Sequence, residues 1–488
     1  MEKGRGLGLF WLLMGRMALL MGVALLIPFV ASVWWQEPES WLFLLPAGFS
    51  LLLGAGLCRL FKAPLRQLTL REGALFIVFS WVLMGIIGAM PYRSSGLLSG
   101  QAAVFFETFS SLTTTGLSCL NFDRTGLPQS LLLWHSMMSW LGGLSFIIML
   151  VTVLPQVSGC FGLTLTARQS LSFRPFWHRM SRAMWYGIGV YTGLSAVAML
   201  LFCLVGLPPF EALIRAMTTL SSGGGTSFYS FMLYDDPLLE LVAGLVMLLS
   251  SLSLLLCWKA WARKSFRLLW QDAELRCFCL IFLGAGLLLS GYLYHSGWYD
   301  LTGSLRYGFF QAASFLSTNG FASAPFWLWP GFDRYVLFLL VFVGGCMGSA
   351  AGGLKVMRIL VLFRMTWAEL RHTLHPHMVV SVRIDGLPVA SKILGRILTY
   401  FFLYLLLFIV ASLILSLAGI TLMQAMGIAA GCLTSTGSTA TLFGLGSLYF
   451  LPDWAKWACC VLMVLGRIEI FSFLILVDMG AHVLQRRW

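Results

Sequence analysis

The sequence predicts an all-α integral membrane protein with four pore repeats in a pseudo-fourfold arrangement, preceded by an N-terminal pair of helices. Three observations carry this prediction. Of the 488 residues, 59% are hydrophobic and only 10% are charged, whereas a soluble protein carries about 25% charged residues. Apolar stretches of about 20 residues, the length that crosses a bilayer as a helix, recur along the whole chain. A short polar phrase is repeated four times between them.

The apolar stretches predict ten membrane-spanning helices. They cover residues 9–34, 40–58, 72–91, 129–155, 184–206, 238–258, 277–295, 334–363, 393–419 and 455–484. The first stretch runs past Trp34 without a convincing small-residue cleavage site, so we expect a retained helix rather than a signal peptide.

Positive charge is divided unevenly between the two ends of these spans. When the N-terminus is placed inside and the spans alternate, the inner segments hold 25 of the 32 Lys and Arg residues and the outer segments hold six. Because cytoplasmic segments carry an excess of Lys and Arg, both termini are expected in the cytoplasm. The net charge of +13 then arises from juxtamembrane clusters. We therefore expect contact with membrane lipids and no nucleic-acid partner.

The repeated phrase reads Leu, two small hydroxyl residues, a small or polar residue, and Gly. Its copies are Leu112–Gly116, Leu220–Gly224, Leu316–Gly320 and Leu433–Gly437, with their glycines 108, 96 and 117 residues apart. Self-similarity at a nearly fixed period indicates a repeat architecture. We therefore divide the chain into an N-terminal helix pair (1–66) and four pore repeats at 67–158, 180–264, 270–366 and 388–488.

Each phrase follows a segment that is too short to cross the bilayer. These segments are Gly100–Leu112, Pro209–Leu220, Ser304–Leu316 and Thr421–Leu433. About 12 residues of helix reach roughly 18 Å at 1.5 Å per residue. We expect four half-helices that enter from outside and end at mid-membrane, where the partial negative charge of their C-termini favours a cation.

The phrases themselves predict a filter for a monovalent cation. Backbone oxygens arranged in a ring can replace an ion's hydration shell, and non-helical backbone is tolerated at this depth where it lines a pore. The terminal glycines permit backbone angles that are closed to other residues. The expected filter residues are Thr113, Thr114, Thr115, Gly116, Ser221, Ser222, Gly223, Gly224, Ser317, Thr318, Asn319, Gly320, Thr434, Ser435, Thr436 and Gly437. A single copy alone would more simply be a capped loop after a short helix.

Five further motifs accompany the phrases. They are Phe106-Glu107, Trp140-Leu141-Gly142-Gly143, Asp272-x-Glu274-x-Arg276, the glycine-rich stretch 344–355, and Gly466-Arg467-Ile468-Glu469. Together with the phrases they resemble the Trk/Ktr/HKT superfamily of potassium transporters, and specifically its TrkH/TrkG membrane subunits. The resemblance spans essentially the whole chain, and the extra N-terminal helix pair is similar to TrkH rather than to KtrB.

The resemblance implies potassium uptake across the bacterial inner membrane through a single-chain pore, usually in a homodimer. It also implies a cytosolic TrkA-like regulatory ring, so a nucleotide (ATP/ADP or NAD) is expected on that separate subunit and no cofactor on this chain. In this family, Gly at the end of every phrase goes with potassium selectivity, while Ser in the first phrase favours sodium. Gly116, Gly224, Gly320 and Gly437 match the potassium pattern.

Two departures from the family pattern concern the second repeat. Gly225 follows the second phrase where an aromatic residue is usual, and Leu249-Ser250-Ser251-Leu252 stands where many relatives have a Gly pair. These departures leave the exact selectivity and the docking of a regulator open, but not the architecture.

A glycine-rich stretch at residues 344–353 interrupts the predicted span 334–363. Because Gly in a helix interior costs about 1 kcal/mol relative to Ala, the cluster is expected to break the helix. The resemblance assigns the stretch to an intramembrane loop that closes the pore. Its expected gate residues are Gly344, Gly345, Gly348, Ser349, Gly352 and Gly353. Close packing of small residues in an unbroken helix is the alternative.

Arg467 is the one basic residue that the alternation assigns to neither side of the membrane. A charge inside the membrane is functional by default. The resemblance places Arg467 in the pore beneath the filter, where it would form an electrostatic barrier and belong to the gate. A structural pair with Glu469 or Asp478 is the alternative, which the two-residue spacing to Glu469 weakens because it puts the side chains on different helix faces.

Two other functions stay open. One is a sodium-permeable or weakly selective transporter of the same fold, and the other is a polytopic membrane enzyme. Against the enzyme, no Ser-His-Asp, HExxH or acidic metal motif falls at membrane depth in the sequence. His135 has no evident acidic partner and is expected to be a packing residue. We therefore expect a transport protein rather than an enzyme.

Overall fold

The computed structural model describes residues 2–38, 40–62, 70–120, 127–152, 180–224, 230–265, 267–375 and 381–468. These residues are mainly helical, with one two-stranded antiparallel hairpin formed by β1 (Arg383–Ile384) and β2 (Leu387–Pro388). Within the described ranges, seven helices are long and apolar enough to cross a membrane. The predicted class of an α-helical membrane protein is confirmed.

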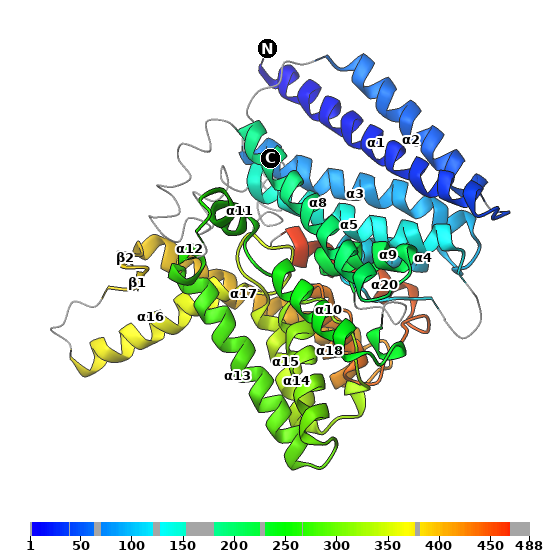
Figure 1. The fold of residues 1–488 in the computed structure, drawn as a ribbon. Helices are drawn as coiled ribbons and strands as arrows, with labels where there is room; N and C mark the ends of the chain where they lie inside the picture. Colours follow the sequence, from blue (N-terminus) through cyan, green and yellow to red (C-terminus); the bar gives the residue numbers. More distant parts are fainter. Residues whose placement is uncertain are drawn as a thin grey trace.

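The first two helices form a pair at the edge of the molecule (Figure 1). Helices α1 (Glu2–Trp34) and α2 (Trp41–Leu60) pack along each other, and α1 also contacts the next part of the chain. Small residues make the close approach possible, because a Cβ on Gly54 would lie 2.7 Å from the side chain of Leu19. The N-terminal unit thus packs beside the pore helices rather than among them.

The remaining helices fall into four sets, and the second helix of each set ends at one of the four phrases. The first set holds α3 (Leu70–Ser94), α4 (Gln101–Leu112) and α5 (Gln129–Thr152). The second holds α8 (Met180–Leu204), α9 (Pro209–Ser221), α10 (Pro237–Ser250), α11 (Leu254–Ala262) and α12 (Arg267–Gln271). The third holds α13 (Ala273–His295), α14 (Leu301–Leu316), α15 (Gly331–Val343) and α16 (Val356–Leu374). The fourth holds α17 (Ser391–Ser416), α18 (Leu422–Thr434), α19 (Ser438–Thr441) and α20 (Asp453–Ile468).

The four sets form a closed ring. Helix α5 of the first set packs against α8 and α9 of the second, and α10 packs against α14 of the third. Helix α15 then contacts α18 of the fourth set, and α20 returns to α4 of the first. This cyclic order is the arrangement that four repeats around one axis require.

The four short helices lie where the sequence places the half-helices. Helices α4, α9, α14 and α18 each end at or within one residue of the Leu that opens a phrase. The start of α18 is fixed by a capping box, in which Thr421 and Gln424 satisfy each other's backbone amides. Asp300 caps α14 by accepting a hydrogen bond from the amide of Gly303.

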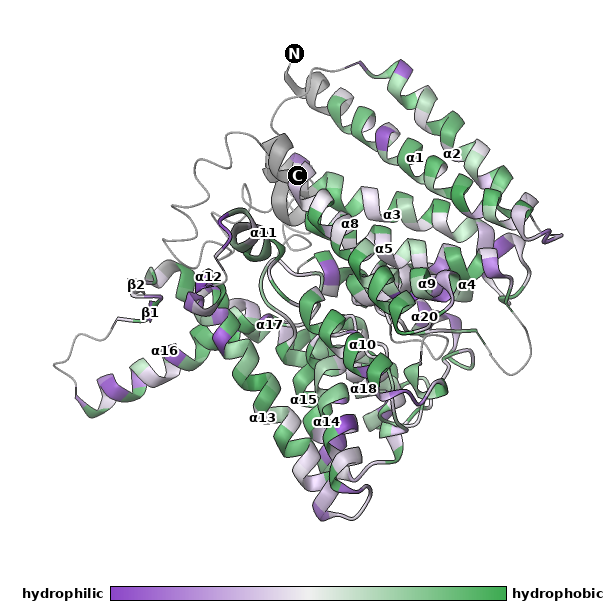
Figure 2. Ribbon diagram, in the orientation of Figure 1, coloured by the Kyte–Doolittle hydropathy of each residue, from purple (hydrophilic) through white to green (hydrophobic). Residues whose placement is uncertain are grey.

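Two of the predicted spans are broken in the structure, and the sequence predicts only the break in 334–363. The span 238–258 is divided between α10 and α11, with a break at residues 251–253. The span 334–363 is divided by residues 344–355, after which α16 runs away from the helix bundle (Figure 1, yellow). Figure 2 shows hydrophilic residues on α16, in contrast to the largely hydrophobic helices of the bundle. The tenth predicted span, 455–484, is described only as far as Ile468.

Only some of the repeat boundaries predicted from the sequence can be compared with the ends of helices and strands in the structure. Boundaries at 66–67, 158 and 488 lie outside the described residues. The boundary at 366 falls inside α16 and the one at 388 falls inside β2, so neither coincides with the end of an element.

Candidate functional site: a buried ring of four loops and the loop beneath it

All four phrases end their short helices with the same backbone conformation. The third residue of each phrase is left-handed, with φ of 58° at Thr114, 56° at Ser222, 58° at Thr318 and 57° at Ser435. For residues other than Gly this conformation costs about 1–2 kcal/mol. Strain of this kind gathers at functional sites when the surroundings impose it. The same strain at four equivalent positions therefore marks the phrases as one repeated device.

The hydrogen bonds of the four helix ends are also equivalent. The amide of each fourth residue bonds to the carbonyl five residues earlier, as in a Schellman cap. The N···O distances are 2.8 Å for Thr115 to Ser110, 2.9 Å for Gly223 to Thr218, 3.0 Å for Asn319 to Ser314 and 3.0 Å for Thr436 to Gly431. The four phrases thus share one backbone conformation although their sequences differ, since the fourth residue is Thr, Gly, Asn and Thr in turn.

The phrases meet one another around the ring. The amide of Gly437 donates to the carbonyl of Thr115, and the hydroxyl of Ser438 donates to the carbonyl of Gly320. A Cβ on Gly224 would lie 2.2 Å from the ring of Phe321, which directly follows the third phrase. All sixteen predicted filter residues are buried. These contacts join the fourth phrase to the first and third, and the second phrase to the residue that follows the third.

The four phrase glycines serve two different needs. Gly116 and Gly320 both have φ of 75°, which favours glycine. Gly437 has φ of −61° and Gly224 has no positive φ, so the expectation of a special backbone angle at every phrase glycine is wrong at these two. A Cβ on Gly437 would instead lie 2.4 Å from the carbonyl carbon of Gly116. Close approach of two loops explains this glycine.

The glycine-rich stretch forms an irregular loop between α15 and α16. Gly344, Gly348 and Gly353 have φ of 70°, 83° and 76°, so the expected helix break is confirmed and the unbroken helix is excluded. The loop also packs closely, because a Cβ on Gly352 would lie 1.9 Å from the carbonyl oxygen of Thr434. The predicted gate residues 344–353 thus lie directly against the fourth phrase.

Two phrase hydroxyls bond to this loop. Ser222 Oγ donates to the carbonyl of Ala350 over 2.9 Å, and Thr318 Oγ1 accepts a hydrogen bond from the amide of Gly352 over 2.7 Å. The equivalent hydroxyls, Thr114 Oγ1 and Ser435 Oγ, have no hydrogen-bond partner among the described residues. Among the described residues, these hydroxyls therefore hydrogen-bond the loop to the second and third phrases, whereas the fourth phrase meets it by close packing.

Glu274 holds the loop from the other side. Its carboxylate, at the start of α13 and 3% exposed, accepts hydrogen bonds from the amides of Met347 (2.6 Å) and Met357 (3.2 Å). The amide of Cys346 donates to the carbonyl of Ser251, in the break between α10 and α11. Sequence reasoning did not include Glu274 among the predicted gate residues, although an acidic residue opening an apolar span was a usable signal.

Arg467 lies at the end of α20 and is 1% exposed. None of its three guanidinium nitrogens has a hydrogen-bond partner among the described residues. Its Cζ atom lies 4.4 Å from the centre of the Phe146 ring on α5. The alternative partners Glu469 and Asp478 lie outside the described residues. Sequence reasoning also missed Phe146, which carries no signal of its own in an apolar span.

A buried acid lies behind the first phrase. Glu107 on α4 is 0% exposed and accepts hydrogen bonds from the amide of Cys119 (2.9 Å) and the hydroxyl of Ser118. His135 Nε2 lies 3.4 Å from Glu107 Oε1. The expectation that His135 has no acidic partner is therefore wrong, because the two residues meet across the α4–α5 contact. Glu107 positions the chain that leaves the first phrase.

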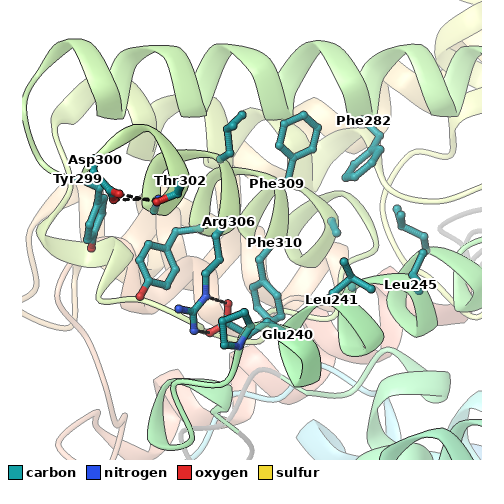
Figure 3. Close-up of a pocket in the computed structure, with 17 residues that line it drawn as sticks. Glu240, Leu241, Leu245, Phe282, Tyr299, Asp300, Thr302, Arg306, Phe309 and Phe310 are labelled. Atoms are coloured by element: carbon teal, nitrogen blue, oxygen red, sulfur yellow. Dashed lines mark hydrogen bonds and ion pairs between the residues drawn. The ribbon is translucent and has the colours of Figure 1, made fainter. Parts of the chain in front are cut away.

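A cavity of about 810 Å³ lies apart from the ring, between α10, α13 and α14 (Figure 3). Leu241, Leu245 and Phe282 line its apolar part. At its polar end Arg306 forms two hydrogen bonds with Glu240, at 2.8 and 2.9 Å. None of the phrase or gate residues lines this cavity. The predicted site is therefore a ring of buried loops rather than an open pocket.

Known proteins resemble this chain over nearly its whole length. The family model TrkH, described as "Cation transport protein", matches residues 43–481. Trk system potassium uptake protein TrkG of Escherichia coli is 32% identical over 95% of this chain and 96% of its own. TrkH of Halomonas elongata is 29% identical over 95% and 97%. The crystal structure of the potassium transporter TrkH from Vibrio parahaemolyticus superposes with a TM-score of 0.85 at 27% identity, covering 96% of this chain and 97% of that one. With its apolar spanning helices, this chain is a multi-pass membrane protein that belongs to the TrkH family of cation transport proteins.

Proposed function

We propose that this chain is the membrane subunit of a bacterial potassium uptake system and conducts potassium across the inner membrane through the ring of four phrases. One observation carries the proposal: four buried helix ends share one strained backbone conformation although their sequences differ. The C-termini of four short helices converge there, and their partial negative charge favours a cation. The relatives named as potassium uptake proteins support potassium as the ion. The same relatives are named as transport proteins, so we propose no enzymatic activity.

The loop 344–355 would act as the gate of this pore. It lies against three of the four phrases, through Ser222, Thr318 and Thr434. Arg467 would add a fixed positive charge beneath the filter, where it opposes the passage of cations. Displacement of the loop and of Arg467 would together open the path.

Regulation would come from other chains. We propose that the protein assembles as a homodimer and binds a cytosolic TrkA-like ring that carries the regulatory nucleotide (ATP/ADP or NAD). The name "Trk system" of the relatives supports a multi-component assembly. Growth of a potassium-uptake-deficient bacterium on low potassium, with and without a TrkA-like partner, tests both claims. No rescue under either condition would refute potassium uptake.

A sodium-permeable or weakly selective transporter is the second candidate, and the first phrase decides between them. In Gly116→Ser the new side chain must adopt φ of 75°, so the loop should distort and sodium permeation should rise relative to potassium. The measurement is the reversal potential under bi-ionic conditions. Gly96→Ser is the matched control, since Gly96 has φ of 67° in an exposed loop of the same set. Equal reversal potentials for Gly116→Ser and the unmodified protein would contradict the role of the first phrase.

The barrier role of Arg467 has its own test. Arg467→Ala should raise potassium flux in proteoliposomes, because the fixed charge is removed. Arg16→Ala is the control, since Arg16 lies on the exposed side of α1. Equal flux in Arg467→Ala and the unmodified protein would remove Arg467 from the gate.

A further inference from the structure

We propose that Phe146 is a positioning residue of the gate, which holds the Arg467 guanidinium beneath the filter through the face of its aromatic ring. This inference rests on the proposed function, because it concerns the residue that places the proposed barrier charge. It brings the first set of helices, which carries neither the glycine-rich loop nor Arg467, into the gate.

The first step is the surroundings of Arg467. A buried guanidinium normally has carboxylate or carbonyl partners, because an unpaired buried charge is costly. Among the described residues Arg467 has no such hydrogen-bond partner, and its Cζ atom lies 4.4 Å from the centre of the Phe146 ring. A cation over an aromatic face is attracted by the ring quadrupole, and the attraction grows when water is excluded. Phe146 is itself only 4% exposed, so this condition is met.

The second step is how α5 and α20 place the two residues. A Cβ on Gly142 would lie 1.7 Å from the carbonyl oxygen of Leu112, and one on Gly466 would lie 2.4 Å from that of Leu433. These glycines set α5 and α20 directly against the ends of the first and fourth short helices. Phe146 follows Gly142 by four residues and so lies on the same helix face. Both members of the pair are thereby fixed relative to the phrases.

The third step is a second cation on the same ring. Lys355, which closes the glycine-rich loop, places its Nζ 5.8 Å from the centre of the Phe146 ring and donates to the carbonyl of Ala351. One aromatic ring therefore contacts a cation from the third set and a cation from the fourth. The negative ring face attracts both charges, which would otherwise repel each other in a buried site. Movement of the loop and release of Arg467 would thus be linked through Phe146.

The test replaces Phe146 by a series of progressively fluorinated phenylalanines in the full chain. Fluorination weakens the negative ring face and leaves the shape nearly unchanged. Potassium flux of the purified protein in proteoliposomes should rise stepwise with fluorination, by about tenfold for the most fluorinated ring, which corresponds to about 1.4 kcal/mol. Phe146→Trp should keep the flux low, because Trp is the strongest cation–π partner. Phe43, fully buried on α2, provides the matched control for fluorination.

A double-substitution cycle identifies the cation. In an Arg467→Ala background, fluorination of Phe146 should have no further effect on flux, because the cation that the ring holds is gone. In a Lys355→Gln background the effect should persist.

The outcomes separate this inference from the proposed function. If flux is measurable and Arg467→Ala raises it, but fluorination of Phe146 leaves it unchanged, the positioning role is wrong and the barrier stands. A stepwise rise that persists without Arg467 would also overturn the role. If the unmodified protein and Arg467→Ala both carry no potassium, the proposed function itself fails.

Discussion

Glycine is most strictly required in this fold where a long helix crosses the end of a short one. The contacts of Gly142 with Leu112 and of Gly466 with Leu433 are made to backbone oxygens. A backbone atom cannot move aside by changing rotamer, so an added methyl group must displace a whole helix. The sequence shows both glycines, but not which of its 50 glycines has this role.

Gly142→Ala should therefore destabilise the protein strongly. The added Cβ would approach Leu112 O to 1.7 Å, and overpacking of a buried contact costs about 1–3 kcal/mol or more. Gly284→Ala on α13 is the control, because no atom lies within 4 Å of its added Cβ and Ala is favoured over Gly in a helix by about 1 kcal/mol. Thermal unfolding in detergent measures both. Equal melting temperatures for the two variants would contradict the assigned contact.

Glu107→Gln should destabilise the chain segment that follows the first phrase. Gln keeps one acceptor oxygen and carries no charge, so the hydrogen bonds from Cys119 N and Ser118 Oγ become fewer and weaker. Hydrogen bonds to charged groups contribute about 1.5–3 kcal/mol. We expect a lower melting temperature and weaker discrimination of potassium from sodium. Glu37→Gln is the control, since Glu37 bonds to Ser130 outside the ring. A larger loss of selectivity in Glu37→Gln than in Glu107→Gln would reverse the assignment.

At the scale of elements, the sequence predicts those breaks whose cause is local. Five glycines break the span 334–363 because each opposes a helix interior, and the structure shows the loop. The break at Ser251 in the second set has no local cause, since Ser and Leu are acceptable in helices. There the Ser251 carbonyl accepts a hydrogen bond from Cys346 of the loop, and Leu254 bonds to Gly348. A tertiary contact with the loop causes this break, so the sequence of the second set alone does not predict the break.

The hydrogen bonds between the phrases and the loop 344–355 should hold the loop in place, and removing one of them should weaken this attachment. Thr318→Val keeps the side-chain volume but leaves the Gly352 amide without its acceptor. Because a hydrogen bond contributes about 1 kcal/mol net, the loop should open about fivefold more often. Cys346 lies in the loop and is 3% exposed, so its rate of modification by a thiol reagent reports the opening.

Ser435→Ala is the matched control for Thr318→Val. Ser435 has the same backbone conformation as Thr318, but its hydroxyl has no partner among the described residues. Modification of Cys346 should therefore proceed at the unmodified rate in Ser435→Ala. Equal acceleration in both variants would mean that any substitution in the ring, and not the loss of the hydrogen bond to the loop, exposes Cys346.

At the scale of the whole molecule, the four sets share one order of elements, but each set contributes different residues to the ring and its surroundings. The third set carries the loop and its anchor Glu274, the fourth carries Arg467, and the first carries Phe146 and Glu107. Four identical subunits could not make this division, because every set would carry every feature. The fourfold repeat was readable from spacing alone, whereas the division depends on contacts between sets that are far apart in the sequence.

The orientation of the whole molecule gives the last prediction. The excess of Lys and Arg on alternate ends predicts that residue 296 lies outside the cell and residue 381 inside. Ser296 and Ser381 are both exposed, so cysteines placed there are open to a membrane-impermeant thiol reagent. In a background without the native cysteines, Ser296→Cys should be labelled in intact spheroplasts, and Ser381→Cys only after the membrane is permeabilised. The opposite pattern would invert the topology and place the loop 344–355 on the outer side of the filter, where it could not act as an inner gate.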